Sequence, residues 1–205
     1  MKYALISDIH SNLPALEAVL ADIDGREDVR AVYYLGDLAG YAPCPTRRLP
    51  YYETGAFPAS RATTTQRWLT TTSTADVRST VGGREKLAHL SYEWTRSYVP
   101  PETKRDLGGL PFRMDLRPMG GHKSYPQIIL VHGTPTLNTL YCTKDRSDSF
   151  CTKMTRAAGA KEGDLIAFGH THKPWHREVE DIRFLNTGSV GKPKDGDWRA
   201  GCVLW

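Results

Sequence analysis

The sequence predicts an α/β fold in which layers of sheet and helix carry polar loops at the strand ends. Short apolar runs typical of buried strands alternate with segments whose apolar residues recur at helical spacing. Four of these runs end in small clusters of Asp, His and Gly. A chain of 205 residues is long enough for one domain with a sizeable core. We therefore expect a single domain spanning residues 1–205.

A strand–helix–strand unit is predicted at the N-terminus. Residues 2–7 contain the apolar run Tyr-Ala-Leu-Ile, which indicates a buried strand. Apolar residues then recur at helical spacing, with Pro14 in the first turn and Gly25 at the expected helix end. Residues 31–35 form a second apolar run. This order favours a parallel strand pair with a right-handed crossover.

Further strands are predicted in the second half of the chain. Residues 128–131 and 165–168 are apolar runs of strand length. Residues 175–180 and 182–185 resemble a hairpin, and residues 201–205 begin a last apolar strand. Helices are expected over residues 85–98 and 149–158.

Composition is ordinary for a soluble globular protein, with 40% hydrophobic and 24% charged residues. No apolar run approaches the roughly 20 residues that span a bilayer, and the N-terminus does not resemble a signal peptide. We therefore expect a cytoplasmic protein. The four cysteines form no C-x-x-C pair, which disfavours a thiolate zinc site and favours free thiols in a reduced compartment.

Four apolar strands each end in residues that can bind metal. Loops at one edge of a sheet converge in space, so these loops can share one site. Imidazole and carboxylate ligands suit Mn, Fe, Zn or Ni. Glycine neighbours let the backbone turn sharply near an ion. The clusters are Asp8-Ile9-His10, Gly36-Asp37, His132-Gly133 and Gly169-His170-Thr171-His172.

A single cluster of this kind has a plainer explanation. A lone Asp or His after a strand is most often a helix cap or a hydrogen-bonded polar group. The pairs Asp8-x-His10 and His170-x-His172 are stronger, because alternate loop residues can face one ion. Capping does not explain four clusters in this order, so we infer a metal site at the strand-end loops.

These four clusters resemble the motifs of the calcineurin-like metallophosphoesterase superfamily. The runs at residues 7–12 and 36–43, and the ending Asn-Thr-Gly-Ser-Val-Gly at residues 186–191, look like its small prokaryotic single-domain members of phosphodiesterase type. The resemblance covers residues 1–45 and about 84–200. It implies a four-layer αββα sandwich with a binuclear centre of two divalent metal ions.

The resemblance also implies a role for each metal-competent residue. Asp37 and His10 are the candidate catalytic residues. Two metals lower the pKa of a water molecule that attacks the phosphate in line. The expected function is hydrolysis of phosphodiesters or phosphomonoesters, with Mn as the first expected ion and Fe, Ni or Zn as alternatives. One metal would take Asp8, His10, Asp37 and His172, and the second would take Asp37 as a bridge, His132 and His170.

One family motif is missing. In the family, an Asn from Gly-Asn-His-Asp or Gly-Asn-Tyr-Asp completes the second metal, and neither run occurs in this sequence. At the expected place stands a Thr-rich stretch, residues 61–76, in which Thr63 takes the position of the Asn. A divergent surface insertion would explain this stretch. The alternative function is then a non-catalytic or impaired metal-binding member of the same fold.

We hypothesise that residues 46–83 are a frameshifted translation. With suitable third bases, the codons of residues 62–76 encode Gly-Asn-Tyr-Asp when they are read one base earlier. Because the third base of each codon was chosen to fit, the match alone is weak support. Its position, where the family motif is expected, supports the hypothesis more strongly. Resequencing the source DNA should reveal compensating insertions or deletions near codons 45 and 83. An unbroken reading frame would contradict the hypothesis.

A shifted segment would lack a designed apolar face, so we expect reduced stability, metal binding and activity. The restored motif would carry Tyr in place of the family His that protonates the leaving group, and His10, His122 and His176 are candidates to assist. The chain ends at Trp205 just as a strand begins, and we expect a truncated C-terminus.

The net charge of +4 suggests nucleic-acid binding as a further alternative. Much of that excess lies in the aberrant segment, and no aromatic-plus-basic stacking pattern supports it. We expect a small phosphate-ester substrate and neither a nucleic-acid nor a membrane partner. A homo-oligomer is an open alternative, because dimers and tetramers are common among the proteins that the chain resembles.

Overall fold

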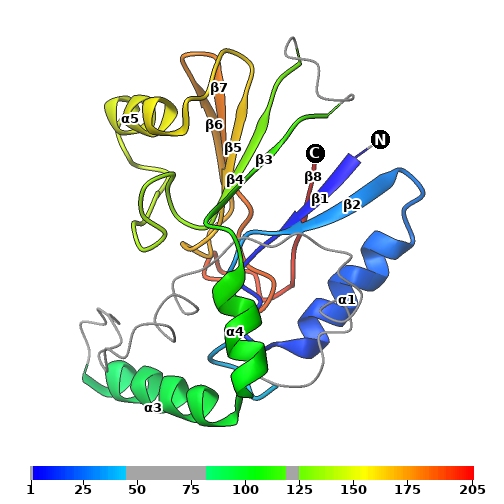
Figure 1. Ribbon diagram of the computed structural model, residues 1–205, viewed down its shortest axis with the longest axis vertical. Helices are drawn as coiled ribbons and strands as arrows, with labels where there is room; N and C mark the ends of the chain where they lie inside the picture. Colours follow the sequence, from blue (N-terminus) through cyan, green and yellow to red (C-terminus); the bar gives the residue numbers. More distant parts are fainter. Residues whose placement is uncertain (1, 45–81, 119–124) are drawn as a thin grey trace.

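Two β-sheets lie face to face between outer helices in the computed structural model, which describes residues 2–44, 82–118 and 125–205. Figure 1 shows α1 (Leu13–Asp24) beside one sheet and α5 (Asp148–Ala158) beside the other. The layered α/β prediction, including the αββα sandwich, is confirmed. Most of the aberrant segment, with Thr63, and also His122 lie outside the described residues.

The first sheet is built from the predicted N-terminal unit. Strand β1 (Lys2–Ile6) pairs in parallel with β2 (Val29–Tyr34), as the strand–helix–strand order predicts. Strand β8 (Val203–Leu204) pairs antiparallel with the other side of β1. The strand order in this sheet is β2-β1-β8, so the two ends of the described chain are neighbours.

The second sheet has the strand order β3-β4-β5-β7-β6. Its three central strands, β4, β5 and β7, run parallel, and both edge strands are antiparallel to their neighbours. The predicted hairpin is formed by β6 and β7, and its turn residues Glu180 and Asp181 have φ of 50° and 58°. Two positive φ values are typical of a type I′ hairpin turn. The strand bounds are β3 Arg113–Leu116, β4 Ile128–Val131, β5 Leu165–Phe168, β6 Trp175–Val179 and β7 Ile182–Asn186.

Side chains alternate between three apolar clusters along the central strands. In β1, Ala4 and Ile6 pack with α1, whereas Leu5 packs between the two sheets. In β4, Ile129 and Leu130 divide in the same way between the α5 cluster and the inter-sheet cluster. Because both faces are covered, these strands are apolar throughout, which is the pattern that made them recognisable in the sequence.

The helix ends follow local sequence. Asn12 caps α1 by accepting from the Ala15 amide at 3.3 Å, and Gly25 ends it with a right-handed φ of −71°, so its freedom to adopt positive φ is not used there. Ser147 caps α5, which ends at Gly159 in the left-handed conformation. Both caps satisfy amides that the helix itself leaves unpaired.

Two elements were missed by the sequence reasoning. Helix α3 (Gly82–Tyr98) covers the predicted helix at residues 85–98, but α4 (Pro101–Gly109) and β3 were not expected. Only Leu107 of α4 is buried, so the segment lacks a clear apolar stripe. Strand β3 has only four residues and lies at a sheet edge.

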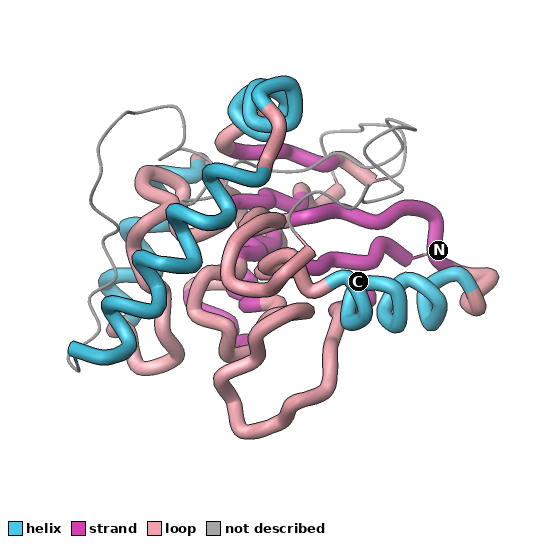
Figure 2. The backbone as a smooth tube through the Cα atoms, turned by 90° about the horizontal axis from the view of Figure 1, so that it is seen from below, coloured by secondary structure: helices cyan, strands magenta, loops and turns pink. Residues whose placement is uncertain are grey.

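The strand ends that carry the metal-competent residues open onto one side of the sandwich. Figure 2, seen from below, shows loops grouped over the strands at this end. No helix among residues 2–44, 82–118 and 125–205 is long and apolar enough to cross a membrane. All four cysteines are free thiols, namely Cys44, Cys142, Cys151 and Cys202.

Candidate metal centre

Six buried residues from four strand-end loops meet at one place. They come from the loops after β1 and β2 of the first sheet and after β4 and β5 of the second, so the loops that meet belong to two sheets and not, as expected, to one edge of a single sheet. The structure brings together every metal-competent residue that the sequence analysis singled out. None is more than 8% exposed: Asp8, His10, Asp37, His132, His170 and His172.

The first group consists of Asp8, His10 and His172. Asp8 Oδ1 lies 3.3 Å from His172 Nε2 and 3.7 Å from His10 Nε2. The two imidazole Nε2 atoms are 3.2 Å apart. Three ligand atoms on three side chains therefore surround a common point.

The second group consists of Asp37, His132 and His170. Asp37 Oδ2 lies 3.5 Å from His132 Nε2, which is 3.1 Å from His170 Nδ1. Asp37 Oδ2 is also 3.7 Å from His10 Nε2 of the first group. Asp37 is thus the side chain that joins the two groups.

Backbone carbonyls orient three of the four imidazoles. His132 Nδ1 donates to the Leu35 carbonyl at 2.8 Å, and His172 Nδ1 donates to the Lys192 carbonyl at 2.6 Å. His170 Nε2 donates in the same way to the Thr139 carbonyl at 3.2 Å. An outer nitrogen that donates its proton to a carbonyl turns the inner nitrogen toward the cluster, where its deprotonated form offers a lone pair, and metal-binding histidines are usually arranged in this way.

Two buried polar atoms of the cluster lack hydrogen bonds from the described residues. They are Asp8 Oδ1 and His10 Nδ1, whereas Asp8 Oδ2 accepts from the His170 amide at 2.9 Å. Burying a carboxylate oxygen without a partner is costly, and a cation would remove that cost. The facing lone pairs and the unpaired oxygen therefore fit a metal ion, and the mixed donor set suits Mn, Fe, Zn or Ni.

The loops hold an unusual backbone conformation. Five of the six residues have positive φ, a region that non-glycine residues rarely adopt and that costs of order 1 kcal/mol each. Loop-to-loop hydrogen bonds keep them there: His10 N donates to Asp37 O at 2.9 Å, and Asp8 N donates to Gly36 O at 3.0 Å. Such strain is typical of functional sites that the surrounding fold over-determines. The five are Asp8, His10, Asp37, His170 and His172.

The last residue of β7 and the loop that follows it hold two of the metal-competent loops in place. Ser189 Oγ donates to the Asp8 carbonyl at 2.7 Å, and Asn186 Nδ2 donates to the Gly169 carbonyl at 2.7 Å. Gly191 is required because a Cβ there would overlap the Ile9 carbonyl. The Asn-Thr-Gly-Ser-Val-Gly run thus stabilises the loops after β1 and β5.

The two carboxylates have opposite pKa shifts. Burial raises the pKa of Asp8 to about 6, although the His132 charge opposes this. Burial acts on Asp37 in the same direction, but the charge and hydrogen bond of His132, with two further histidines, hold the pKa of Asp37 well below its ordinary value. Asp37 is therefore firmly negative at neutral pH.

The four histidines divide in a similar way. Burial lowers the pKa of His10 and of His170 to about 4, and that of His172 to about 2. Burial also acts to lower the pKa of His132, but the charge and hydrogen bond of Asp37 raise it to about 9. Without a cation, His132 holds a proton that a metal ion would displace.

Three side chains at the rim were not given roles by the sequence reasoning. The Tyr41 ring meets the His10 ring edge-on with centroids 4.8 Å apart, and the Tyr141 ring stacks on His170 at 4.2 Å. Lys192 Nζ lies 3.2 Å from the Tyr41 ring centroid. Burial, with repulsion from Lys194, lowers the pKa of Lys192 to about 8. These contacts join segments that are distant in the sequence, so no local sequence pattern predicts them.

His176, one of the residues considered for leaving-group protonation, lies apart from the cluster. It is exposed on β6, where it pairs in register with Leu185. The structure therefore does not bring His176 to the groups that contain His10.

A family model identifies the class to which this constellation belongs. The model for the calcineurin-like phosphoesterase superfamily domain matches residues 100–204, about half of the chain. The chain belongs to this superfamily, as its motifs indicated.

Individual relatives agree with this assignment. The chain is 28% identical to the uncharacterized protein MJ0912 of Methanocaldococcus jannaschii, over 98% of this chain and 81% of the relative. A metallophosphoesterase from Sphaerobacter thermophilus has 25% identity and a TM-score of 0.74, over 100% of this chain and 83% of that chain. Hypothetical protein PH1004 from Pyrococcus horikoshii shares the fold, with 20% identity and a TM-score of 0.71 over 94% of this chain and 78% of that chain.

Replacing Gly169 by alanine should distort the cluster. The added Cβ would overlap Ser7 Oγ and lie 2.5 Å from Asp8 Oδ2. We expect the free energy of unfolding to fall by about 1–3 kcal/mol, and Mn²⁺ binding to weaken because Asp8 must move. The control is Gly109→Ala in α4, where nothing lies within 4 Å of the new Cβ. Urea unfolding and Mn²⁺ titration give both quantities, and wild-type values for Gly169→Ala would contradict the expectation.

The metal-free protein should be most stable near neutral pH. The lowered pKa values of His10, His170 and His172 mean that unfolding takes up protons below pH about 6.5, so stability falls with decreasing pH. Because its pKa is raised, Asp8 is protonated in the folded state between pH about 4 and 6, which reduces the net proton uptake on unfolding by one in that range. The contribution of His132 is complete below pH about 6.5 and is lost as the pH rises toward about 9.

Urea unfolding of the chelator-treated protein between pH about 4.5 and 9 measures this dependence. The free energy of unfolding should change by about 1.4 kcal/mol per pH unit for each net proton. His132→Gln should abolish the decline above neutral pH while keeping the decline below it. A free energy that stays constant over the whole range would contradict these assignments.

Proposed function

We propose that this chain is a metal-dependent phosphoesterase that hydrolyses phosphodiesters or phosphomonoesters at a binuclear centre. The observation that carries the proposal is the pair of Asp/His groups joined by Asp37, with inner nitrogens that face one another at 3.1 and 3.2 Å. Such a pair of groups fits two cations side by side. Membership of the calcineurin-like phosphoesterase superfamily supports the reaction class.

Each side chain has a defined task in this proposal. Two divalent ions bound there would neutralise phosphate charge and lower the pKa of a water molecule toward neutrality. Asp37 faces both groups, so it would set the spacing of the ions. All four imidazoles are buried, and backbone carbonyls hold those of His132, His170 and His172, so these three need little reorientation to bind. The proposed ligands are Asp8, His10, Asp37 and His172 for one ion, and Asp37, His132 and His170 for the other.

Mn is the ion that we propose first, because carboxylate and imidazole donors are mixed at the site. Fe, Ni and Zn suit the same donors. His10 and Asp37 remain the proposed catalytic residues, since they lie at the junction of the two groups, 3.7 Å apart from Nε2 to Oδ2. We further propose a small phosphate ester as the substrate and the cytoplasm as the location.

The second candidate function is a metal-binding member of the fold with impaired or no catalysis. The absence of the Gly-Asn motif from the sequence favours it, because the second ion then lacks one family ligand. A Thr63 hydroxyl would be a poor replacement for an amide oxygen. The number of bound ions and the presence of turnover separate the two candidates.

Metal content and hydrolysis should be measured on the same Mn-loaded preparations. The wild type should bind two ions per chain and hydrolyse p-nitrophenyl phosphate or bis(p-nitrophenyl) phosphate. Asp37→Asn should lower kcat on the order of 10²–10³-fold and reduce bound metal, because both groups lose their shared carboxylate. The matched control His176→Asn, outside the cluster, should match the wild type. Two ions without turnover would contradict the enzyme proposal, and one ion or none would favour the second candidate.

A further inference from the structure

A lysine is held beside the first group of the cluster. Lys192 Nζ lies 3.2 Å from the Tyr41 ring centroid, and that ring is 4.8 Å from the His10 ring. Together, these two contacts place the Lys192 ammonium group near the His10 ring. A cation over an aromatic face is attracted by the ring, so Tyr41 fixes a side chain that would otherwise be mobile.

The segments that carry this contact are themselves tied to the cluster. The Lys192 carbonyl accepts from His172 Nδ1 at 2.6 Å, and the Lys194 amide donates to the His172 carbonyl at 3.0 Å. On the other side, Tyr41 has a φ of 66°, and the next amide, that of Ala42, donates to the His10 carbonyl at 3.1 Å. A bulky residue at positive φ is strained, so this position of Tyr41 is imposed by its surroundings.

The two lysines contribute positive charge that the described carboxylates do not neutralise by direct contact. Lys192 interacts at longer range with Asp37, and Lys194 with both Asp8 and Asp37. Neither ammonium group forms an ion pair with a carboxylate among residues 2–44, 82–118 and 125–205. The ammonium group of Lys192 lies beside the cluster through Tyr41, and the backbone of Lys194 is hydrogen-bonded to His172, so positive charge beside the proposed metal centre favours an anion there.

We propose that Lys192, seated on Tyr41, together with Lys194 binds the terminal oxygens of the substrate phosphate and favours phosphomonoesters over phosphodiesters. The proposal rests on the phosphoesterase function proposed above. A monoester phosphate is mostly a dianion at neutral pH, whereas a diester has one negative charge and fewer terminal oxygens. Two ammonium groups therefore gain more from the monoester, both in charge and in charge-assisted hydrogen bonds.

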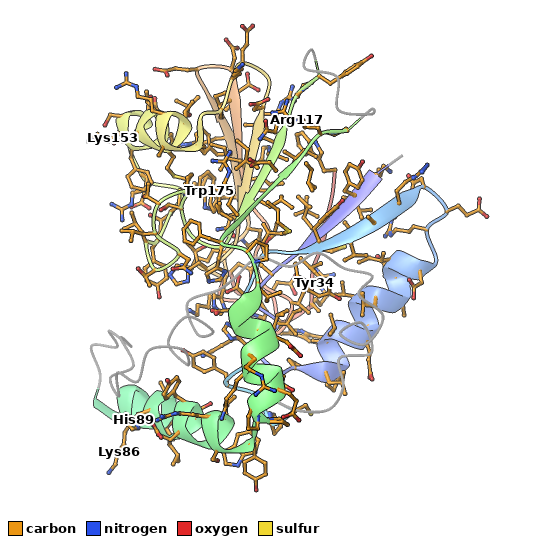
Figure 3. All side chains as sticks on the ribbon, viewed as in Figure 1. Tyr34, Lys86, His89, Arg117, Lys153 and Trp175 are labelled. Atoms are coloured by element: carbon orange, nitrogen blue, oxygen red, sulfur yellow. The ribbon has the colours of Figure 1, made fainter. Side chains whose placement is uncertain are left out.

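The test compares two substrates on the Mn-loaded full chain at pH 7. Lys192→Gln and Lys194→Gln should each lower kcat/KM for p-nitrophenyl phosphate about tenfold, the effect of losing one charge-assisted hydrogen bond. For bis(p-nitrophenyl) phosphate the loss should be less than about threefold. Lys192→Arg should retain most of the monoester activity. Lys153→Gln, on the outer helix α5 (Figure 3), makes the same charge change away from the cluster and should have no effect.

Tyr41 supplies a second comparison, because its ring lies under the Lys192 ammonium group as well as against the His10 ring. Tyr41→Phe keeps an aromatic face under the ammonium group and should preserve the preference for the monoester. Tyr41→Leu should lower monoester kcat/KM severalfold with little change for the diester. Equal losses on both substrates in the lysine variants, or no loss on either, would overturn the proposed selection by charge.

Binding of inorganic phosphate separates this inference from the proposed function. Calorimetric titration of the Mn-loaded protein at pH 7 needs no turnover. Lys192→Gln should weaken phosphate binding about tenfold, while binding of diethyl phosphate should change little. If this difference in binding is seen although the wild type hydrolyses neither substrate, the proposed function is wrong and the lysine site is supported. If phosphate binds Lys192→Gln as tightly as the wild type, the lysine site is wrong.

Discussion

The burial of two carboxylates at the meeting point of the two sheets is the constraint on which the rest of the site depends. Asp8 and Asp37 are 0% and 6% exposed, and each needs positive partners to remain ionised in such surroundings. The nearest partners of the two carboxylates are imidazoles, whereas Lys192 and Lys194 act on them only at longer range. Neutral imidazoles do not balance two negative charges, so the charge balance is left to a proton on His132 or to metal cations.

The sandwich architecture makes this burial feasible. Strand ends from both sheets deliver loops to one point, and Leu35 shows how closely they interlock. Its side chain packs between the sheets, while its carbonyl accepts from His132 of the opposite sheet. Core packing and imidazole orientation are therefore fixed by the same residue. Gly169 likewise lets the β5 loop approach Asp8, which a side chain would prevent.

The sequence was informative where function and burial leave local patterns. Central strands such as Ile128–Val131 are apolar on both faces, and the Asp, His and Gly that follow them could be recognised without coordinates. Helix α4 and strand β3 lack such a pattern, because most residues of α4 are exposed and most of β3 are half-buried. The contact between Lys192 and Tyr41 depends on how two distant loops meet, so it has no local pattern in the sequence. Gly25 was predicted correctly as a helix end, although its backbone is right-handed.

The two halves of the centre are not equivalent. In the proposed assignment Asp8, His10, His172 and the shared Asp37 give the first ion four protein ligands, whereas the second has three. The second ion must also displace the proton of His132, whose raised pKa of about 9 adds a cost to binding at neutral pH. An amide ligand of the kind that the family resemblance implies would offset part of this cost. The first ion should therefore bind more tightly, and occupancy of the second decides whether the centre is binuclear.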